Sequence, residues 1–392
     1  MPDIGFATPP RGLAALAGGL VVAVTATEAL AAPPRTIDTQ TGPVRVETLA
    51  DRLEYPWGLA FLPDGRMLVT ERPGRLRIIA ANGGKPYEVV QGLPKIWAQG
   101  QGGLHDVVLD PAFVDNRLVY VCYAEERDDG QSTAVARGRL AMSSLDDVQV
   151  IFRQVPKVDG PNHFGCRLAF APDGRLFVTL GERFKFDPAQ DLSSDLGKIV
   201  RIDPDGTIPA DNPFLGRKGA RPEIWSYGHR NVQGAAINPQ SGLLWVSEFG
   251  PRGGDEINIP RAGGNYGWPL VSWGRHYDGG SIPEPSTRPD LQDAIHHWTP
   301  SISPSGIAFY TGELLPGWNG NLLVAGLSSE ALIRLTLDGE RVTAEERLAM
   351  NTRIRDVAQG PDGAVYLLTD DDRGAILRVS PAEAAGTPPP TR

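Results

Sequence analysis

The stretch LAFAPDGRLFVTLGE, Leu168 to Glu182, decides the fold of this chain of 392 residues. An apolar run meets a Pro-Asp-Gly turn and a second apolar run follows, a pattern typical of two antiparallel strands joined by a tight turn. Close copies are LAFLPDGRMLVTE from Leu59 and VAQGPDGAVYLLTD from Val357. Looser copies start at Asp106, Ala235 and Ile307. The hairpin therefore occurs six times.

The spacing of the six hairpins predicts the architecture. Their starts lie between 47 residues (Leu59 to Asp106) and 72 residues (Ala235 to Ile307) apart, which is at or above the roughly 40 to 50 residues of a four-stranded propeller blade. The strand at 44–50 is expected to close the ring by joining the last blade. The predicted fold class is all-β, a six-bladed β-propeller with ligands over its central channel; the alternative is a stack of β-sandwich domains.

Composition agrees with a turn-rich β protein and restricts its partners. The chain has 46 Gly and 35 Pro, while 41% of its residues are hydrophobic and 22% are charged. Its net charge of -9 argues against a general nucleic-acid binder, because such a protein needs a basic face to displace counterions from phosphates. An anion site would have to be a local cluster of arginines.

The two ends of the chain look unlike its middle. Arg11 is followed by a run of small and apolar residues that ends in the A-x-A pattern at 29–31, which indicates a secretory signal peptide and a periplasmic or secreted protein. The alternative is an uncleaved N-terminal anchor. No other segment is apolar enough to span a membrane. The predicted division is signal peptide 1–31, flexible linker 32–43, propeller domain 44–380 and disordered tail 381–392.

His163 is the first candidate for catalysis. It stands at the mouth of the third hairpin, where a histidine is often only a hydrogen-bonded structural residue. If that hairpin pairs without a bulge around its Pro-Asp-Gly turn, positions whose numbers sum to 345 face each other, so His163 meets Glu182. A carboxylate beside an imidazole fixes its tautomer and stabilises the protonated ring, which prepares a general base.

Arginines supply the second group of candidates. Arg230 and Asn231 stand in the polar loop SYGHRNVQG, just before a blade strand. Arg353 and Arg355 occupy alternate positions of NTRIRDV, so in an extended segment both side chains point the same way. Because a guanidinium group binds carboxylates through two parallel hydrogen bonds, these arginines predict a site for a polycarboxylate.

Two further segments have ligand-binding character. In AQGQGGLHDVVLDP, Gln101 and His105 flank a glycine pair that permits close backbone approach to a ligand; the alternative is a tight turn. The segment EFGPRGGDEINIPRAGGNYGWP, 248–269, combines acidic side chains with turn-rich backbone. These are oxygen ligands of the kind that calcium takes, although the spacing does not match an EF-hand loop.

The chain contains two cysteines, Cys122 and Cys166. A disulfide framework therefore does not hold the fold together, but one bridge is compatible with an oxidising compartment. The alternative for Cys166 is a buried inert thiol. The sequence leaves both open.

Several motifs occur together in a recognisable order. GQGGLHDVVLDP, NHFGCRLAFAPDG, EIWSYGHRN, GPRGGDEINIP, GGNYGWP and RIRDV resemble those of the soluble aldose sugar dehydrogenases that depend on pyrroloquinoline quinone (PQQ). The resemblance covers roughly 44–380. It implies a six-bladed propeller enzyme, an oxidoreductase that oxidises aldose sugars at the anomeric carbon to lactones, reduces PQQ and passes electrons to an external acceptor.

The resemblance also implies roles for individual residues. His163 is similar to the base that removes the proton of the anomeric hydroxyl, and Glu182 to its acidic partner. PQQ contacts are implied for Gln101, Arg230, Asn231, Tyr277, Arg353 and Arg355. Calcium beside the cofactor is implied for the backbone carbonyls of Gly250 and Pro251, and a second calcium for Glu256 and the backbone of Tyr266.

This chain departs from the family pattern at three positions. Ser328 stands where the family has a cofactor-contacting lysine, which predicts weaker PQQ affinity or a shifted redox potential. Asn162 replaces an aspartate and Cys166 a glycine. Two other functions stay open at this point, a calcium-dependent propeller lactonase or hydrolase and a non-enzymatic extracellular binding propeller. The arginines disfavour the first, and His163 with the calcium-like loop disfavours the second.

Overall fold

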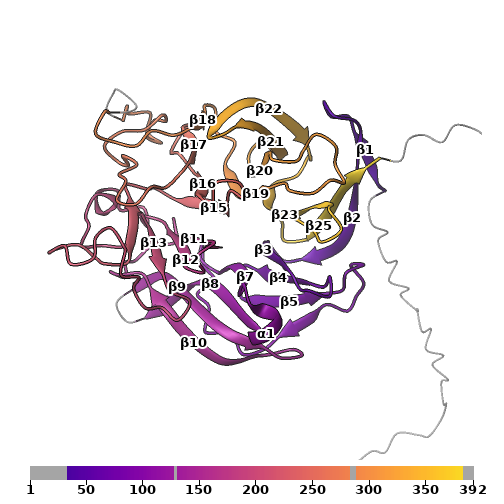
Figure 1. The fold of residues 1–392 in the computed structure, drawn as a ribbon, viewed down its shortest axis with the longest axis horizontal. Helices are drawn as coiled ribbons and strands as arrows, with labels where there is room; N and C mark the ends of the chain where they lie inside the picture. Colours follow the sequence, from indigo (N-terminus) through magenta and orange to yellow (C-terminus); the bar gives the residue numbers. More distant parts are fainter. Residues whose placement is uncertain (1–32, 128–129, 283–287, 383–392) are drawn as a thin grey trace, which may run out of the picture. The chain divides into compact units, whose positions relative to one another are not determined.

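The structure is a computed structural model that describes residues 33–127, 130–282 and 288–382. The expected signal peptide and almost all of the expected tail lie outside these residues. The described chain is built almost entirely of β-strands, which form six antiparallel sheets (Figure 1). None of the helices in the described ranges has the length and apolar character needed to cross a bilayer.

Each of the first three sheets, or blades, contains four strands. Blade 1 contains β3 (Pro56–Phe61), β4 (Met67–Glu71), β5 (Arg75–Ile79) and β6 (Glu88–Val90). Blade 2 contains β7 (Leu104–Leu109), β8 (Leu118–Arg127), β9 (Gly130–Leu140) and β10 (Leu145–Arg153), with the short helix α1 (Phe113–Asn116) between β7 and β8. Blade 3 contains β11 (Gly165–Phe170), β12 (Leu176–Leu180), β13 (Lys198–Ile202) and β14 (Ile224–Tyr227), with the 3-10 turn η1 (Asp187–Ala189) after β12.

The last three blades follow the same plan, with one addition. Blade 4 contains β15 (Val232–Ile237), β16 (Leu244–Glu248), β17 (Asp255–Asn258) and β18 (His296–Trp298). Blade 5 contains β19 (Pro304–Phe309), β20 (Leu322–Gly326), β21 (Ala331–Asp338) and β22 (Arg341–Ala349). Blade 6 contains β23 (Ile354–Gln359), β24 (Val365–Thr369), β25 (Gly374–Pro381), β2 (Val44–Leu53) and β1 (Arg35–Ile37).

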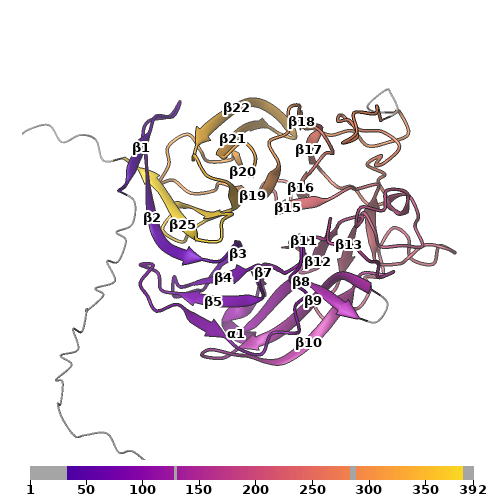
Figure 2. The ribbon, with the colours of Figure 1, turned by 180° about the vertical axis from the view of Figure 1, so that it is seen from behind.

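The six blades close into a ring. The innermost strands β3, β7, β11, β15, β19 and β23 each contact the innermost strands of both neighbouring blades, and β23 contacts β3 to complete the circle (Figures 1 and 2). The N-terminal strand β2 pairs antiparallel with the C-terminal strand β25, with Val46 opposite Val379. The six-bladed propeller and its closure by the strand that starts at Val44 are thus confirmed.

The expected flexible linker at 32–43 contains a strand. β1 pairs with the outer edge of β2, and Ile37 packs against the apolar cluster between blades 5 and 6. Arg35 donates a hydrogen bond of 2.6 Å to the carbonyl of Met350 in blade 5. The prediction of a linker was wrong for this segment because the open edge of β2 offers unpaired backbone groups, which a further strand satisfies.

The apolar core lies between the blades. Six clusters of buried apolar side chains each fill one interface between adjacent blades. The axis is lined instead by polar groups of the inner strands. Buried Arg167 of β11 donates to Asp106 of β7 at 3.2 Å and pairs with Asp356 of β23 at 3.0 Å. Since buried charges need partners, this arrangement ties three blades together below the channel mouth.

The repeated Pro-Asp-Gly turn fixes each hairpin. In blade 3, the amide of Gly174 donates to the carbonyl of Ala171 at 2.9 Å, and Gly174 has a φ of +83°. A residue with a side chain seldom adopts that conformation, which explains the glycine in LAFAPDGRLFVTLGE. The turn sets which residues reach the open end of the hairpin, where the candidate site lies.

Candidate active site

His163 and Glu182 meet at the open end of the third hairpin, as the sequence predicted. Nδ1 of His163 lies 2.6 Å from Oε1 of Glu182, and both side chains are buried. The premise of a hairpin without a bulge was wrong. Near the turn Leu168 faces Val178, so facing numbers sum to 346, and a bulge between Gly165 and Leu168 shifts the register to Gly165 facing Leu180. The bulge re-aims the strand end.

The backbone and Glu182 hold His163 in one orientation. Its amide donates to Oε1 of Gln101 at 2.8 Å, and its φ of +54° lies in the left-handed region. Oε2 of Glu182 accepts the amide hydrogens of Lys185 and Phe186. Oε1 of Glu182 is an acceptor in this contact, so the proton of the neutral imidazole lies on Nδ1 of His163. Nε2 then carries the lone pair, and it has no hydrogen-bond partner among the described residues.

The protonation of His163 is set by its surroundings. Burial lowers the pKa of His163; the hydrogen bond to Glu182 opposes this, and the charge of Arg230 adds to the lowering. The ring is therefore neutral near pH 7, with Nε2 able to accept a proton. Glu182 stabilises the imidazolium once that proton arrives, which is the arrangement of a general base.

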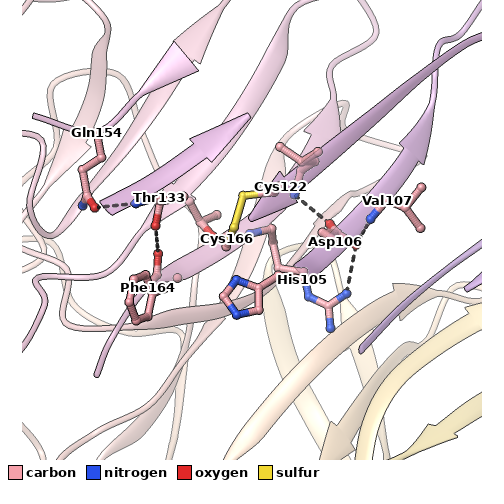
Figure 3. The surroundings of a disulfide bond; sticks show 12 residues. His105, Asp106, Val107, Cys122, Thr133, Gln154, Phe164 and Cys166 are labelled. Atoms are coloured by element: carbon pink, nitrogen blue, oxygen red, sulfur yellow. Dashed lines mark hydrogen bonds and ion pairs between the residues drawn. A yellow bond between two sulfur atoms is a disulfide. The ribbon is translucent and has the colours of Figure 1, made fainter. Parts of the chain in front are cut away.

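Cys122 and Cys166 form a disulfide beside this pair. Their Cα atoms lie 5.6 Å apart, and the bond joins β8 of blade 2 to the bulge in β11 of blade 3. The hypothesis of an inert thiol at Cys166 was wrong, because the bulge brings the two residues together. Figure 3 shows the disulfide with His105 and Phe164, which line the neighbouring cavity.

A cavity of about 170 Å³ opens over the channel. We call it the arginine cavity. It is lined by Trp57, Arg72, Gln101, His105, Phe164, Gly165, Gln233, Phe249, Leu327, Arg353, Arg355 and Asp370. Of the predicted site residues, Gln101, His105, Arg353 and Arg355 lie here. Predicted Asn231 is buried below it, where its Oδ1 accepts the amide hydrogen of Gly165 at 3.1 Å.

Asp370 is a functional residue that the sequence reasoning missed. One of its oxygens binds Arg353 at 2.8 Å and the other binds Arg355 at 3.1 Å. Burial alone would raise the pKa of Asp370, but Arg355 and Arg353 hold it below its usual range. The carboxylate fixes both guanidinium groups at the cavity wall and cancels one of their charges.

A repeated acidic position would have revealed Asp370. An acid stands at the end of the second strand, or within two residues after it, in blades 1, 3, 4 and 6: Glu71, Glu182, Glu248 and Asp370. Each has a cationic or imidazole partner at the same end of its blade. The position is therefore a general device of this propeller for orienting side chains around the channel.

Arg230 and Tyr277 lie in a second space, next to the arginine cavity. We call it the aromatic cavity; it measures about 310 Å³ and is also lined by Phe184 and Phe186. Nη2 of Arg230 lies 3.2 Å from the hydroxyl of Tyr277, while Nε of Arg230 is buried and has no partner in the described part of the chain. The ring of Phe184 packs edge-on against His163 at 5.1 Å. His163 thus adjoins residues of both cavities, because Phe164, its neighbour in the chain, lines the arginine cavity and Phe184 lines the aromatic cavity.

The four residues predicted to hold calcium all line one small cavity. The carbonyl of Gly250 accepts a hydrogen bond of 2.9 Å from Arg230. Glu256 and Tyr266 line a small cavity of about 20 Å³, the carboxylate cavity, together with Glu248, Gly250 and Pro251. Among the described residues, no group of three or more His, Cys, Asp or Glu side chains is arranged to hold a metal.

The carboxylate cavity nevertheless contains a carboxyl group, that of Glu256, with no cationic partner in the described chain. Burial, and then the charge of Glu248, raise the pKa of Glu256 to about 8. One oxygen of Glu256 accepts a hydrogen bond from Asn258 at 2.9 Å, and no partner for the other lies in the described chain. The buried carboxylate of Glu248 and the half-buried carboxylate of Glu256, with backbone carbonyls nearby, are a donor set that suits a hard cation.

The chain is similar to known proteins over most of its length. The model of a family described as Glucose / Sorbosone dehydrogenase matches residues 53–378. The aldose sugar dehydrogenase YliI of Escherichia coli is 46% identical over 370 residues, which cover 92% of this chain and 98% of that protein.

Solved structures show the same similarity. The soluble aldose sugar dehydrogenase of Escherichia coli, in its apo form, superposes with a TM-score of 0.84 at 46% identity and covers 86% of this chain and all of its own (100%). The PQQ-bound form of an aldose sugar dehydrogenase from Streptomyces coelicolor gives a TM-score of 0.72 at 31% identity, covering 86% of this chain and 98% of its own.

Proposed function

Because the chain belongs to the glucose / sorbosone dehydrogenase family, we propose that it is a PQQ-dependent oxidoreductase that converts aldose sugars to lactones. The observation that carries the proposal is the buried His163–Glu182 pair, in which Nε2 of a neutral imidazole has no hydrogen-bond partner among the described residues. The pair adjoins Phe164 of the arginine cavity and Phe184 of the aromatic cavity. Reduced cofactor is then reoxidised by an external electron acceptor. The sugar and that acceptor are the partners of the reaction.

The residues present suit a polycarboxylate quinone. The arginine cavity offers the guanidinium groups of Arg353 and Arg355 for carboxylates, and Gln101 adds an amide. The unpartnered Nε of Arg230 is a donor without an acceptor, which a bound group satisfies. When bound, PQQ supplies the two-electron oxidant that takes the hydrogen of the anomeric carbon with its bonding pair.

His163 performs the proton transfer in this proposal. Its Nε2 removes the proton of the anomeric hydroxyl as the carbon–oxygen double bond of the lactone forms. The resulting imidazolium is stabilised by Glu182, 2.6 Å from Nδ1, and no reorganisation is needed because the amides of Lys185 and Phe186 already fix the carboxylate. Phe184 and Tyr277 offer apolar faces at the cavity mouth against which a sugar ring packs.

We also propose that calcium binds in the carboxylate cavity. Glu248 and Glu256 would hold it, with backbone carbonyls such as that of Tyr266 completing the donors. The raised pKa of Glu256 supports this, since a divalent cation would relieve the repulsion from Glu248. For the implied calcium beside the cofactor, the carbonyl of Gly250 would have to serve both Arg230 and the ion.

An oxidising location fits the disulfide. A structural bridge such as Cys122–Cys166 forms and persists in secreted and periplasmic proteins and is rare in the cytosol. We therefore keep the proposal of a periplasmic or secreted protein. The propeller lactonase and the binding module are disfavoured. Neither function requires a buried base near the guanidinium groups of three arginines, Arg230, Arg353 and Arg355.

One reconstitution experiment tests the proposed function. The purified apoprotein is incubated with PQQ and calcium, and sugar-dependent reduction of an artificial dye is measured across common aldoses. We expect turnover that requires PQQ, with a change in cofactor absorbance on binding. The absence of both activity and absorbance change would overturn the proposal. Binding without turnover on any aldose would exclude the dehydrogenase and favour the binding module.

A further inference from the structure

We infer that Arg72 is an additional binding residue for the anionic cofactor, contributing an uncommitted guanidinium group to the arginine cavity. The inference deepens the proposed function and rests on it. Arg72 is not among the site residues predicted from the sequence. Its position, its missing counter-ion and the charge of the cavity each point to the same conclusion.

The backbone of Arg72 is fixed between two blades. Arg72 follows β4, and its amide donates to the carbonyl of Tyr55 at 3.0 Å, while its own carbonyl accepts the amide hydrogen of Leu104 at 3.0 Å. Gly103, in the glycine pair after Gln101, packs so closely on Arg72 that a Cβ there would collide with the Arg72 carbonyl. The GQGG loop therefore packs closely on this arginine.

The side chain of Arg72 is held without being neutralised. Its guanidinium carbon lies 4.5 Å from the ring centroid of Tyr55, which restricts its movement by a cation–π contact. The neighbouring carboxylate, Glu71, is already bound to Arg75 at 2.6 Å and to Arg77 at 2.7 Å. Within the described chain, Arg72 has no ion pair and no side-chain hydrogen bond.

The cavity therefore carries surplus positive charge. Among its lining residues are three guanidinium groups, those of Arg72, Arg353 and Arg355, and one carboxylate, Asp370, which already binds the other two arginines. His105 adds no charge: burial, then the charges of Arg355 and Arg72, lower its pKa to about 3. Two positive charges in excess, in a partly enclosed space, call for an anion with more than one negative charge.

A carboxylate of PQQ fits this description. Arg353 and Arg355 share their donors with Asp370, whereas no side-chain donor of Arg72 has a partner among the residues that the structure describes. A planar guanidinium group held over an aromatic ring presents its edge to a carboxylate and forms charge-assisted hydrogen bonds. Arg72 would thus compensate for the positive charge that this chain lacks at Ser328.

The test measures PQQ affinity by quenching of tryptophan fluorescence, for which Trp57 in the cavity wall is a reporter. Wild type, Arg72→Gln and Arg72→Lys are titrated with PQQ at fixed calcium and at two salt concentrations. Loss of a charge-assisted contact predicts a dissociation constant about 10- to 100-fold higher for Arg72→Gln, with a weaker dependence on salt. Arg72→Lys retains the positive charge but lacks the planar guanidinium group, so its dissociation constant should lie between those of the wild type and Arg72→Gln.

Arg117 provides the matched control. Its guanidinium carbon also lies 4.5 Å from an aromatic centroid, that of Phe113, it is half-buried like Arg72, and it does not line the arginine cavity. Arg117→Gln should bind PQQ as the wild type does. The apoprotein melting temperature of Arg72→Gln should change no more than that of Arg117→Gln, because each variant loses one cation–π contact and neither arginine has an ion pair within the described chain.

The outcomes separate the inference from the proposed function. If the wild type binds no PQQ, the cofactor assignment fails and the inference fails with it. If the wild type binds and Arg72→Gln has the same affinity and salt dependence, the inference alone is overturned. If Arg72→Gln and Arg117→Gln weaken PQQ binding equally, the effect comes from net charge alone. That result would also overturn the inference about Arg72.

Discussion

Nδ1 of His163 lies 2.6 Å from Oε1 of Glu182, although neither residue belongs to a strand of the hairpin that carries them. The pair is assembled by the bulge in β11 and by the backbone donors that saturate Glu182. This relationship makes the imidazole a base of fixed tautomer. It also identifies the measurements that distinguish a catalytic histidine from a structural one.

Replacing His163 should stop turnover without preventing cofactor binding. A positioned general base typically raises the rate of proton transfer by about 10²- to 10⁴-fold. The kcat of His163→Ala and of His163→Asn should therefore be lower than that of the wild type by this factor. His163→Asn is the matched variant, because its amide can still donate to Glu182 and avoid leaving a buried carboxylate unpaired. PQQ affinity by fluorescence quenching should stay within about twofold, since losing one neutral group removes no ion pair. Wild-type kcat in His163→Asn would refute the assigned base.

The pH profile should report the lowered pKa of His163. The base acts when neutral, and burial lowers its pKa below the usual 6.5, so kcat/KM should remain high to below pH 6.5 before falling in acid. Glu182 opposes this lowering, and Glu182→Gln should therefore move the acid limb to still lower pH and reduce the plateau. The measurement is kcat/KM against pH for both proteins. An acid limb that moves to higher pH in the variant would contradict the argument.

The disulfide should contribute mainly to stability. It closes a loop with a sequence separation of 44 residues, for which chain entropy predicts about 4 kcal/mol of unfolding free energy. The free energy of unfolding of the double variant Cys122→Ala and Cys166→Ala should be lower by about that amount. The variant should therefore unfold at a lower urea concentration than the wild type. Reductant should lower the midpoint of the wild type to that of the variant and leave the variant unchanged. Identical midpoints of wild type and variant would show that the bridge does not constrain the chain.

Calcium binding should depend on Glu256. Calcium at about 100 times its dissociation constant stabilises a protein by about 2.7 kcal/mol, so the melting temperature of the wild type should rise with calcium and fall with a chelator. Glu256→Gln should lose this response. Glu88→Gln, at an exposed carboxylate of β6, is the control and should respond like the wild type. A calcium response that survives in Glu256→Gln would place the ion elsewhere.

The fold was more predictable from the sequence than the site. The hairpin is a local signal, and its six copies, together with the strand that starts at Val44, were sufficient for the ring. Contacts across blades are not local. Cys122 and Cys166 meet only because the bulge in β11 moves Cys166, and Arg353 and Arg355 are joined by Asp370 from the next strand. A one-residue bulge leaves no spacing pattern in the sequence, and the shared counter-ion Asp370 is signalled there only by the acid that recurs near the strand ends.

Asp370 should contribute more to the stability of the apoprotein than to the stability of the PQQ complex. Asp370→Asn leaves Arg355 buried without its carboxylate, a change that typically costs about 3 to 5 kcal/mol, so the apoprotein should melt at a lower temperature. A cofactor carboxylate that binds Arg353 and Arg355 would replace the missing charge. The rise in melting temperature on adding PQQ should therefore be larger in Asp370→Asn than in the wild type, as differential scanning fluorimetry can show. A smaller rise would mean that these arginines do not bind the cofactor, because the only change at the site is the removal of their competing anion.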